Sequence, residues 1–165
     1  MLDPDHPCAP IAVLFGQLGV TFAIVLSSIG AAYGTAKTGI AVARLGVHKP
    51  SAIMKGFIPI IMAGILGIYG LIVAVLINNN VSTDGKYTLF ASFIHLGAGL
   101  STGACSLVAG YAIGRIGDTC ARSFIKEEKL FTGMILMLIF AEAIGLYGVI
   151  MALLMNNTAK NACVE

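Results

Sequence analysis

The chain has 165 residues, of which 58% are apolar and only 11% are charged, and its mean hydropathy is +0.92. Soluble domains carry about 25% charged residues, so this composition excludes a water-soluble globule, and its hydrophobicity also excludes a disordered chain. The net charge of +2 comes from scattered residues and is too small for a nucleic-acid-binding surface. The composition therefore predicts an integral membrane protein.

Four long stretches of the chain have almost no charged residues. Each exceeds the roughly 20 residues that an α-helix needs to cross a hydrocarbon core of about 30 Å. We place the four spans near residues 11–33, 57–78, 89–113 and 130–155. The predicted fold is all-α, with four transmembrane helices.

The distribution of basic residues predicts the orientation. Eight of the ten Lys and Arg residues lie in two loops, 37–55 and 115–129, which follow spans one and three. Cytoplasmic loops carry an excess of Lys and Arg, so we expect both loops in the cytosol. The N-terminal residues 1–10, the turn 80–88 and the C-terminal residues 158–165 are then lumenal.

Two glycosylation sequons, which begin at Asn80 and Asn156, lie on the lumenal side. Both are adjacent to a predicted span. We therefore expect neither of them to carry sugar.

The chain contains a gap-free internal duplication. Its two repeats are residues 11–79 and 89–157, and equivalent residues differ by 78 in number. The match is clearest in spans two and four, where Ala63, Gly67, Tyr69 and Gly70 correspond to Ala141, Gly145, Tyr147 and Gly148. Each repeat holds two spans and one cytosolic loop, so the sequence predicts two duplicated helical hairpins.

Spans one and three carry small residues at helical spacing, whereas Ile, Leu, Val and Met dominate spans two and four. Small residues let helix backbones approach closely, and the inner circle of a ring of hairpins has the smaller circumference. We therefore expect spans one and three to line the inside of a ring and spans two and four to form its rim. The residues expected to pack in this way are Gly30, Gly34, Gly99, Gly103 and Gly110. A compact, glycine-rich bundle of four helices is the alternative.

Glu142 is the only Asp, Glu, Lys or Arg inside any span, and its equivalent in the first repeat is Gly64. It lies about 12 residues, or roughly 18 Å of helix, from either end of its span. An ionised carboxylate at that depth is costly, so we expect the side chain to hold a proton and to release it beside a cation or a water path. The alternative is a protonated Glu that only hydrogen-bonds to a neighbouring helix. The residues expected around the carboxyl are Ala63, Gly64, Tyr69 and Tyr147, with the Tyr69 hydroxyl as a hydrogen-bond partner.

Sodium and other metals fit this site less well than a proton. A hard cation needs about five or six oxygen ligands, and residues 61–66 of the facing span have no side-chain oxygen. The four cysteines form no CxxC pair and have no His at ligand spacing, so we expect no metal and no other cofactor. His95 and Gln17, which are equivalent in the repeat, are expected to pack near the lumenal end of their helices.

Three segments carry a resemblance to a known family: IGAAYGTAK at 29–37, IPIIMAGI at 58–65, and LIFAE followed by GLYG within 138–148. The order and spacing of these segments, together with the single Glu of the fourth span, make the chain similar to the proteolipid c subunits of eukaryotic V-type proton ATPases. The number of spans and the position of the Glu disfavour the c″ type, while c and c′ both stay open.

The resemblance implies a ring of c-type proteolipid subunits in the membrane sector, turned by ATP hydrolysis elsewhere in the complex. It implies the a subunit of the stator, central-stalk subunits of the d type and membrane lipid as partners, in a vacuolar or endolysosomal membrane. Glu142 would carry one proton from cytosol to lumen at each passage of the a subunit, where a stator arginine stabilises the carboxylate. The chain is not expected to be an enzyme by itself, and it has no GxxxxGK[ST] loop for ATP.

The residues alone leave two other functions open. A stand-alone oligomeric channel would conduct without ATPase partners and would need polar residues along a continuous path, whereas the small-residue stripes are mostly apolar. A structural four-span adaptor would tolerate the replacement of Glu142 by Leu.

Overall fold

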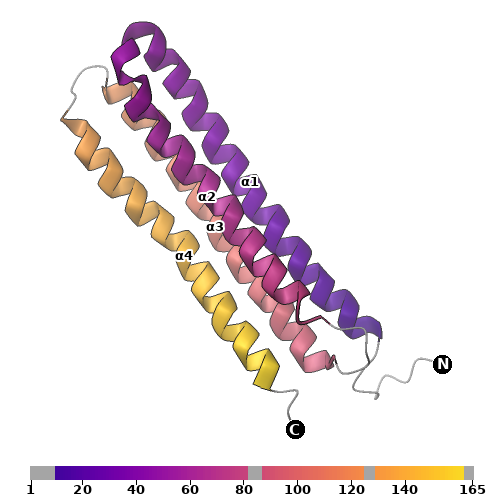
Figure 1. The fold of residues 1–165 in the computed structure, drawn as a ribbon. Helices are drawn as coiled ribbons and strands as arrows, with labels where there is room; N and C mark the ends of the chain where they lie inside the picture. The colour runs from indigo at the N-terminus through magenta and orange to yellow at the C-terminus, as the bar shows by residue number, and fades with distance from the viewer. Residues whose placement is uncertain (1–9, 82–86, 125–128, 162–165) are drawn as a thin grey trace.

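The computed structural model describes residues 10–81, 87–124 and 129–161. Within them are four long α-helices and one short 3₁₀ helix: α1 (Pro10–His48), η1 (Pro50–Ala52), α2 (Ile53–Asn78), α3 (Leu89–Phe124) and α4 (Leu130–Asn161). The four α-helices lie side by side along one direction (Figure 1). Each is long and apolar enough to cross a membrane, which confirms the predicted all-α fold with four spanning helices.

The helices extend well beyond the predicted spans. α1 has 39 residues and α3 has 36, which correspond to about 58 and 54 Å at 1.5 Å per residue. Because the hydrocarbon core is only about 30 Å thick, both helices continue past it. Much of the sequence expected to form the loops 37–55 and 115–129 is therefore helix.

The connection between α1 and α2 is correspondingly short. The Lys49 N–H donates a hydrogen bond to the Leu45 carbonyl oxygen over 2.8 Å, and the Ala52 N–H donates to the Lys49 carbonyl oxygen over 3.0 Å. These bonds carry the backbone from the end of α1 through η1 into α2. The first hairpin thus closes with a tight turn.

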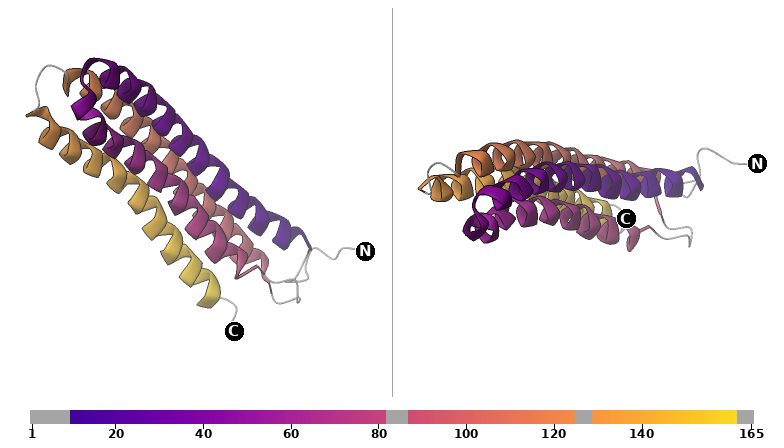
Figure 2. Two further views of the ribbon diagram at one scale, coloured as in Figure 1. Left: turned by 45° about the horizontal axis from the view of Figure 1, so that its top comes forward. Right: turned by 90° about the horizontal axis from the view of Figure 1, so that it is seen from above.

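The four helices form two layers. α1 packs most extensively against α3, and it also packs against α2. α4 packs mainly against α3, and α2 contacts α3 and α4 less extensively. α1 begins and α4 ends at the same end of the bundle (Figures 1 and 2). The close packing of α1 against α3 agrees with the small residues of the first and third spans, whereas α2 and α4 each pack more extensively against the other helix of their own hairpin than against each other.

Glycines bring the backbones of α1 and α3 into direct contact. A Cβ atom added at Gly99 would overlap the carbonyl group of Gly19, and one added at Gly110 would overlap the carbonyl group of Gly30. No side chain larger than hydrogen fits at such positions without moving a helix.

The other two glycines predicted to pack closely do so in the same interior. A Cβ atom at Gly103 would lie 2.6 Å from the Phe22 carbonyl oxygen, and one at Gly34 would lie 2.8 Å from Cβ of Ala63. All five predicted packing glycines therefore serve contacts within one chain.

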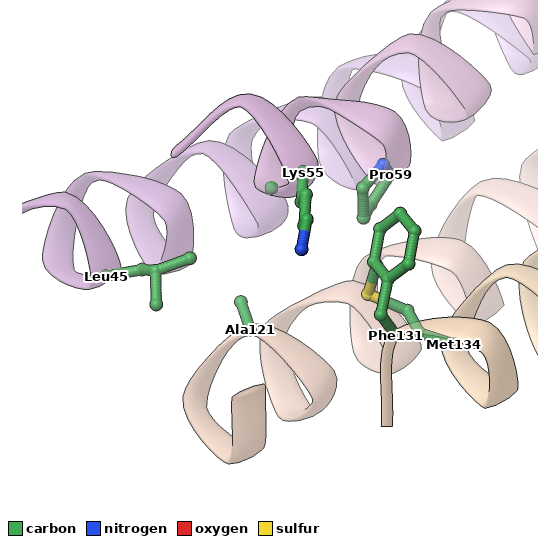
Figure 3. Close-up of a pocket in the computed structure, with 7 residues that line it drawn as sticks. Leu45, Lys55, Pro59, Ala121, Phe131 and Met134 are labelled. Atoms are coloured by element: carbon green, nitrogen blue, oxygen red, sulfur yellow. The ribbon is translucent and has the colours of Figure 1, made fainter. Parts of the chain in front are cut away.

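A small apolar pocket lies between the two hairpins, near the turn from α1 to α2 (Figure 3). Its volume is about 10 Å³, which is close to the space that one water molecule needs. The Lys55 Nζ atom lies 5.6 Å from the centroid of the Phe131 ring, a cation–π distance. The pocket is too small for a cofactor. Its lining residues are Leu45, Lys55, Gly56, Pro59, Ala121, Phe131 and Met134.

Candidate functional site

The carboxyl group of Glu142 lies deep within the apolar stretch of α4. Glu142 is the thirteenth residue of that helix, so about 18 Å of helix separates it from the first residue. The residue is 9% exposed. Leu138 and Ala141 beside it are buried in a cluster to which α2, α3 and α4 all contribute. The carboxyl therefore borders an apolar core.

A tyrosine of α2 reaches this carboxyl. The Tyr69 hydroxyl donates a hydrogen bond to Oε1 of Glu142 over 3.1 Å. Leu66, one turn earlier on α2, is fully buried in the same cluster, so the face of α2 that carries Tyr69 is packed against α4. The structure thus brings together the two residues that the sequence paired.

Gly145 leaves room for the Leu66 side chain, and the Tyr69 ring lies at ordinary van der Waals distance beside it. A Cβ atom added at Gly145 would lie 3.5 Å from Cδ2 of Tyr69 and 2.7 Å from Cδ2 of Leu66. Reasoning from the sequence did not name Gly145 as a site residue. Its recurrence as Gly67 in the first repeat was the signal that could have found it.

Ala63 and Gly64, the other predicted neighbours on α2, differ from each other. Ala63 is fully buried in the same cluster as Ala141, so it helps to form the apolar surroundings of the carboxyl. Gly64 is exposed, and no described atom lies within 4 Å of a Cβ atom added there. Gly64 therefore does not contact Glu142 of its own chain.

The structure does not bring Tyr147 to the carboxyl. Tyr147 is 63% exposed, and no described hydrogen bond joins its hydroxyl to Glu142. Five residues along an α-helix correspond to a rotation of about 140°, so Tyr147 and Glu142 point to different sides of α4.

His95 and Gln17 have different surroundings although they are equivalent in the repeat. His95 is 1% exposed, and its Nδ1 atom lies 2.6 Å from the Tyr87 hydroxyl oxygen. Gln17 is exposed, and its side-chain amide donates to Oδ1 of Asn78 over 3.3 Å. No described contact links either residue to Glu142, so they do not extend the site.

The chemistry available at this site is proton exchange. The described contacts give Glu142 one hydroxyl donor, Tyr69, and a set of apolar neighbours, whereas a hard cation would need several further oxygens. No group of three or more His, Cys, Asp or Glu that could hold a metal lies within the described ranges. A carboxyl in this setting can bind and release a proton without any other ligand.

Comparison with known families supports the internal duplication. Residues 18–77 and 96–155 each match the family of the ATP synthase C subunit. The two matched ranges are offset by 78 residues, which is the offset of the repeats in the sequence.

Similar proteins cover nearly the whole chain. The 16 kDa proteolipid c subunit of the V-type proton ATPase of Rattus norvegicus is 55% identical over 142 residues, which cover 86% of this chain and 90% of the relative. The c′ subunit of the V-type proton ATPase of Saccharomyces cerevisiae is 52% identical over 149 residues, 90% of this chain and 91% of the relative. The V-type proton ATPase proteolipid subunit of Dictyostelium discoideum is 46% identical over 156 residues, 94% of this chain and 80% of the relative. The two matches to the C-subunit family and these relatives show that the chain belongs to the family of V-type proton ATPase proteolipid subunits.

Proposed function

We propose that this proteolipid is the proton carrier of a rotary ring and that Glu142 binds and releases each proton. The proton enters from the cytosol and leaves to the lumen. The observation that carries the proposal is a buried carboxyl within a spanning helix, bordered by an apolar core and hydrogen-bonded to the Tyr69 hydroxyl. The family supplies the setting, because its members assemble with other proteolipid subunits in the membrane sector of a proton pump.

The two protonation states of Glu142 have different requirements. The neutral acid is tolerated against lipid, whereas the carboxylate needs a countercharge or water. No described basic side chain of the chain forms an ion pair with Glu142. The countercharge must therefore come from another subunit, and we assign it to an arginine of the a subunit in the stator.

Tyr69 can stay hydrogen-bonded to the carboxyl in both states. Its O–H donates to the carbonyl oxygen of the protonated acid and to either oxygen of the carboxylate. It thus holds Glu142 in one orientation while the proton arrives and leaves. The positioning of the carboxyl does not depend on its charge.

Orientation and partners follow from the charge distribution and the family. Lys37, Arg44, Lys49 and Lys55 lie along the end of α1, the turn and the start of α2, so we assign this end of the bundle to the cytosol. Both termini are then lumenal. The remaining partners in the proposal are central-stalk subunits of the d type, in a vacuolar or endolysosomal membrane.

Labelling with a lipophilic carbodiimide tests the proposal. The carboxyl must supply a proton to the reagent before its oxygen adds to the activated carbon, so only the protonated acid reacts. We expect the adduct at Glu142 in membranes, and we expect labelling to fall as the pH is raised.

The chain offers two controls for this experiment. Glu142→Gln removes the reactive group. Asp118 is ion-paired with Arg122 over 2.9 Å and is therefore expected to stay unlabelled. Labelling of Asp118 in preference to Glu142, or labelling of Glu142 that does not change with pH, would contradict the proposal.

A further inference from the structure

Two pairs of repeat-equivalent aromatic residues pack ring against ring within the chain. The ring centroids of Phe15 and Phe93 are 4.9 Å apart and their planes are tilted by 31°. Those of Tyr33 and Tyr111 are 5.3 Å apart and the rings stack with an interplanar angle of 23°. In each pair the partners differ by 78 in number, so each residue packs against its own counterpart in the other hairpin.

The contact of each aromatic residue with its own repeat equivalent has a geometric consequence for a ring. The rotation that places the second hairpin beside the first moves Tyr33 onto Tyr111. A head-to-tail ring repeats one rotation until it closes, so the same step places Tyr33 of the next copy against Tyr111. Tyr111 is 55% exposed and Phe93 is 51% exposed in the single chain, which leaves one face of each ring open for this contact.

The two aromatic pairs lie on one line along the helix. Phe15 and Tyr33 are 18 residues apart, which equals five turns of 3.6 residues and about 27 Å of rise. They therefore point in the same direction from α1, at two heights.

The helices that carry the aromatic residues indicate which wall they occupy. All four residues belong to α1 and α3. The small residues of these two helices place them on the inside of the proposed ring, where the circumference is smaller. The aromatic pairs therefore lie along its inner wall.

From this geometry we propose that copies of this chain join through two continuous aromatic belts on the inner wall of the ring, with Tyr111 stacked on Tyr33 of the next copy and Phe93 packed against its Phe15. The partner at this surface is a second copy of this chain. The inference rests on the ring of the proposed function, and it adds which residues form the joint between subunits.

The joint between copies differs from the contact within a copy. Within the chain, Gly110 lies against the backbone of Gly30. The repeat equivalent of Gly30 is Val108, and the repeat equivalent of Gly110 is Ala32. The corresponding contact between copies therefore pairs Val108 of one copy with Ala32 of the next, and both residues are exposed in the single chain. Side chains thus replace the backbone contact, so the aromatic stacks make up a larger share of the contact between copies than of the contact within one.

Cysteine cross-linking between chains tests the joint in assembled membrane complexes. Two differently tagged forms, one with Tyr33→Cys and one with Tyr111→Cys, are co-expressed in a background without the native cysteines and treated with a short bis-maleimide. We expect a cross-linked dimer that carries both tags. Either form alone should give little dimer, because the same residue in two adjacent copies is separated by two hairpin-to-hairpin rotations rather than one. Tyr147→Cys, on the outer layer, replaces Tyr111→Cys in the matched control and should give no mixed dimer with Tyr33→Cys.

A second pair, Phe15→Cys with Phe93→Cys, tests the other belt and covers the case in which a tyrosine variant does not assemble. Mixed dimers from both pairs, or from whichever pair assembles, support the joint. An assembled ring without a mixed dimer at either pair, or with equal cross-linking to Tyr147→Cys, overturns it. Proton transport measured in the same membranes separates the two claims, since a pumping ring without these dimers refutes only the joint.

Discussion

Replacement of Tyr69 by Phe removes one oxygen atom from the proposed site and leaves the aromatic ring in place. The lost group is the hydroxyl that donates to Oε1 of Glu142 over 3.1 Å. The apolar packing of α2 against α4 should persist, because the ring still fills the space beside Gly145. Any change in proton transport then reports on the hydrogen bond.

The expected magnitude follows from the two states of the carboxyl. A hydrogen bond between neutral groups contributes about 0.5–1.5 kcal/mol, and one to a charged group about 1.5–3 kcal/mol. Tyr69→Phe therefore penalises the ionised state by about 1 kcal/mol more than the protonated state. Since each 1.4 kcal/mol corresponds to about tenfold in rate, we expect proton release, and with it ATP-driven acidification, to slow by roughly fivefold to tenfold.

Tyr147→Phe is the matched control. It is the same chemical change at the repeat-equivalent position, where the residue is 63% exposed and has no described hydrogen bond to Glu142. We expect normal acidification, measured with a pH-sensitive dye in vesicles that contain equal amounts of assembled complex. Equal slowing by both variants, or no slowing by Tyr69→Phe, would refute a positioning role for the Tyr69 hydroxyl.

Three further outcomes are expected. Gly99→Ala should destabilise the purified chain by about 1–3 kcal/mol through overpacking, which would lower its unfolding temperature in detergent. Gly133→Ala, with open space around its Cβ position, should not lower that temperature. Equal effects of the two variants would contradict the close contact of α1 and α3. Asn156 is 4% exposed and its amide oxygen accepts a hydrogen bond from a neighbouring amide, so mass spectrometry should find it unmodified, and a glycan there would contradict its burial. In a background without native cysteines, Met54→Cys should react with an impermeant maleimide only from the cytosolic side and Asn157→Cys only from the lumenal side, and the reverse pattern would invert the proposed orientation.

The sequence predicted the features that depend on local pattern. Charge-free stretches longer than 20 residues have few alternatives to spanning helices, and the four helices of the structure contain all four predicted spans. Glu142 stood out because a carboxyl within such a stretch is rare. Tyr69 was found because residues 61–66 of the facing span have no side-chain oxygen and its hydroxyl is the nearest polar group to the level of the carboxyl.

Features that depend on which hairpin a residue faces were not predictable in the same way. The repeat shows that Tyr69 and Tyr147 occupy equivalent places on their helices, but only the packed structure shows that Tyr69 contacts Glu142 while Tyr147 is exposed. For the same reason, the small residues marked Gly99 and Gly110 as packing residues, but only the structure shows that they lie against Gly19 and Gly30 of the same chain. Periodicity identifies a packing face, whereas the identity of its partner is set by tertiary structure.

The central claim is that the carboxyl of Glu142 carries the transported proton. Glu142→Gln is the most direct test, because the amide keeps the shape of the side chain and an oxygen that accepts from the Tyr69 hydroxyl, but it does not exchange a proton. We expect complexes with this variant to assemble and to show no ATP-driven acidification. Acidification at the wild-type rate by assembled Glu142→Gln complexes would contradict the claim.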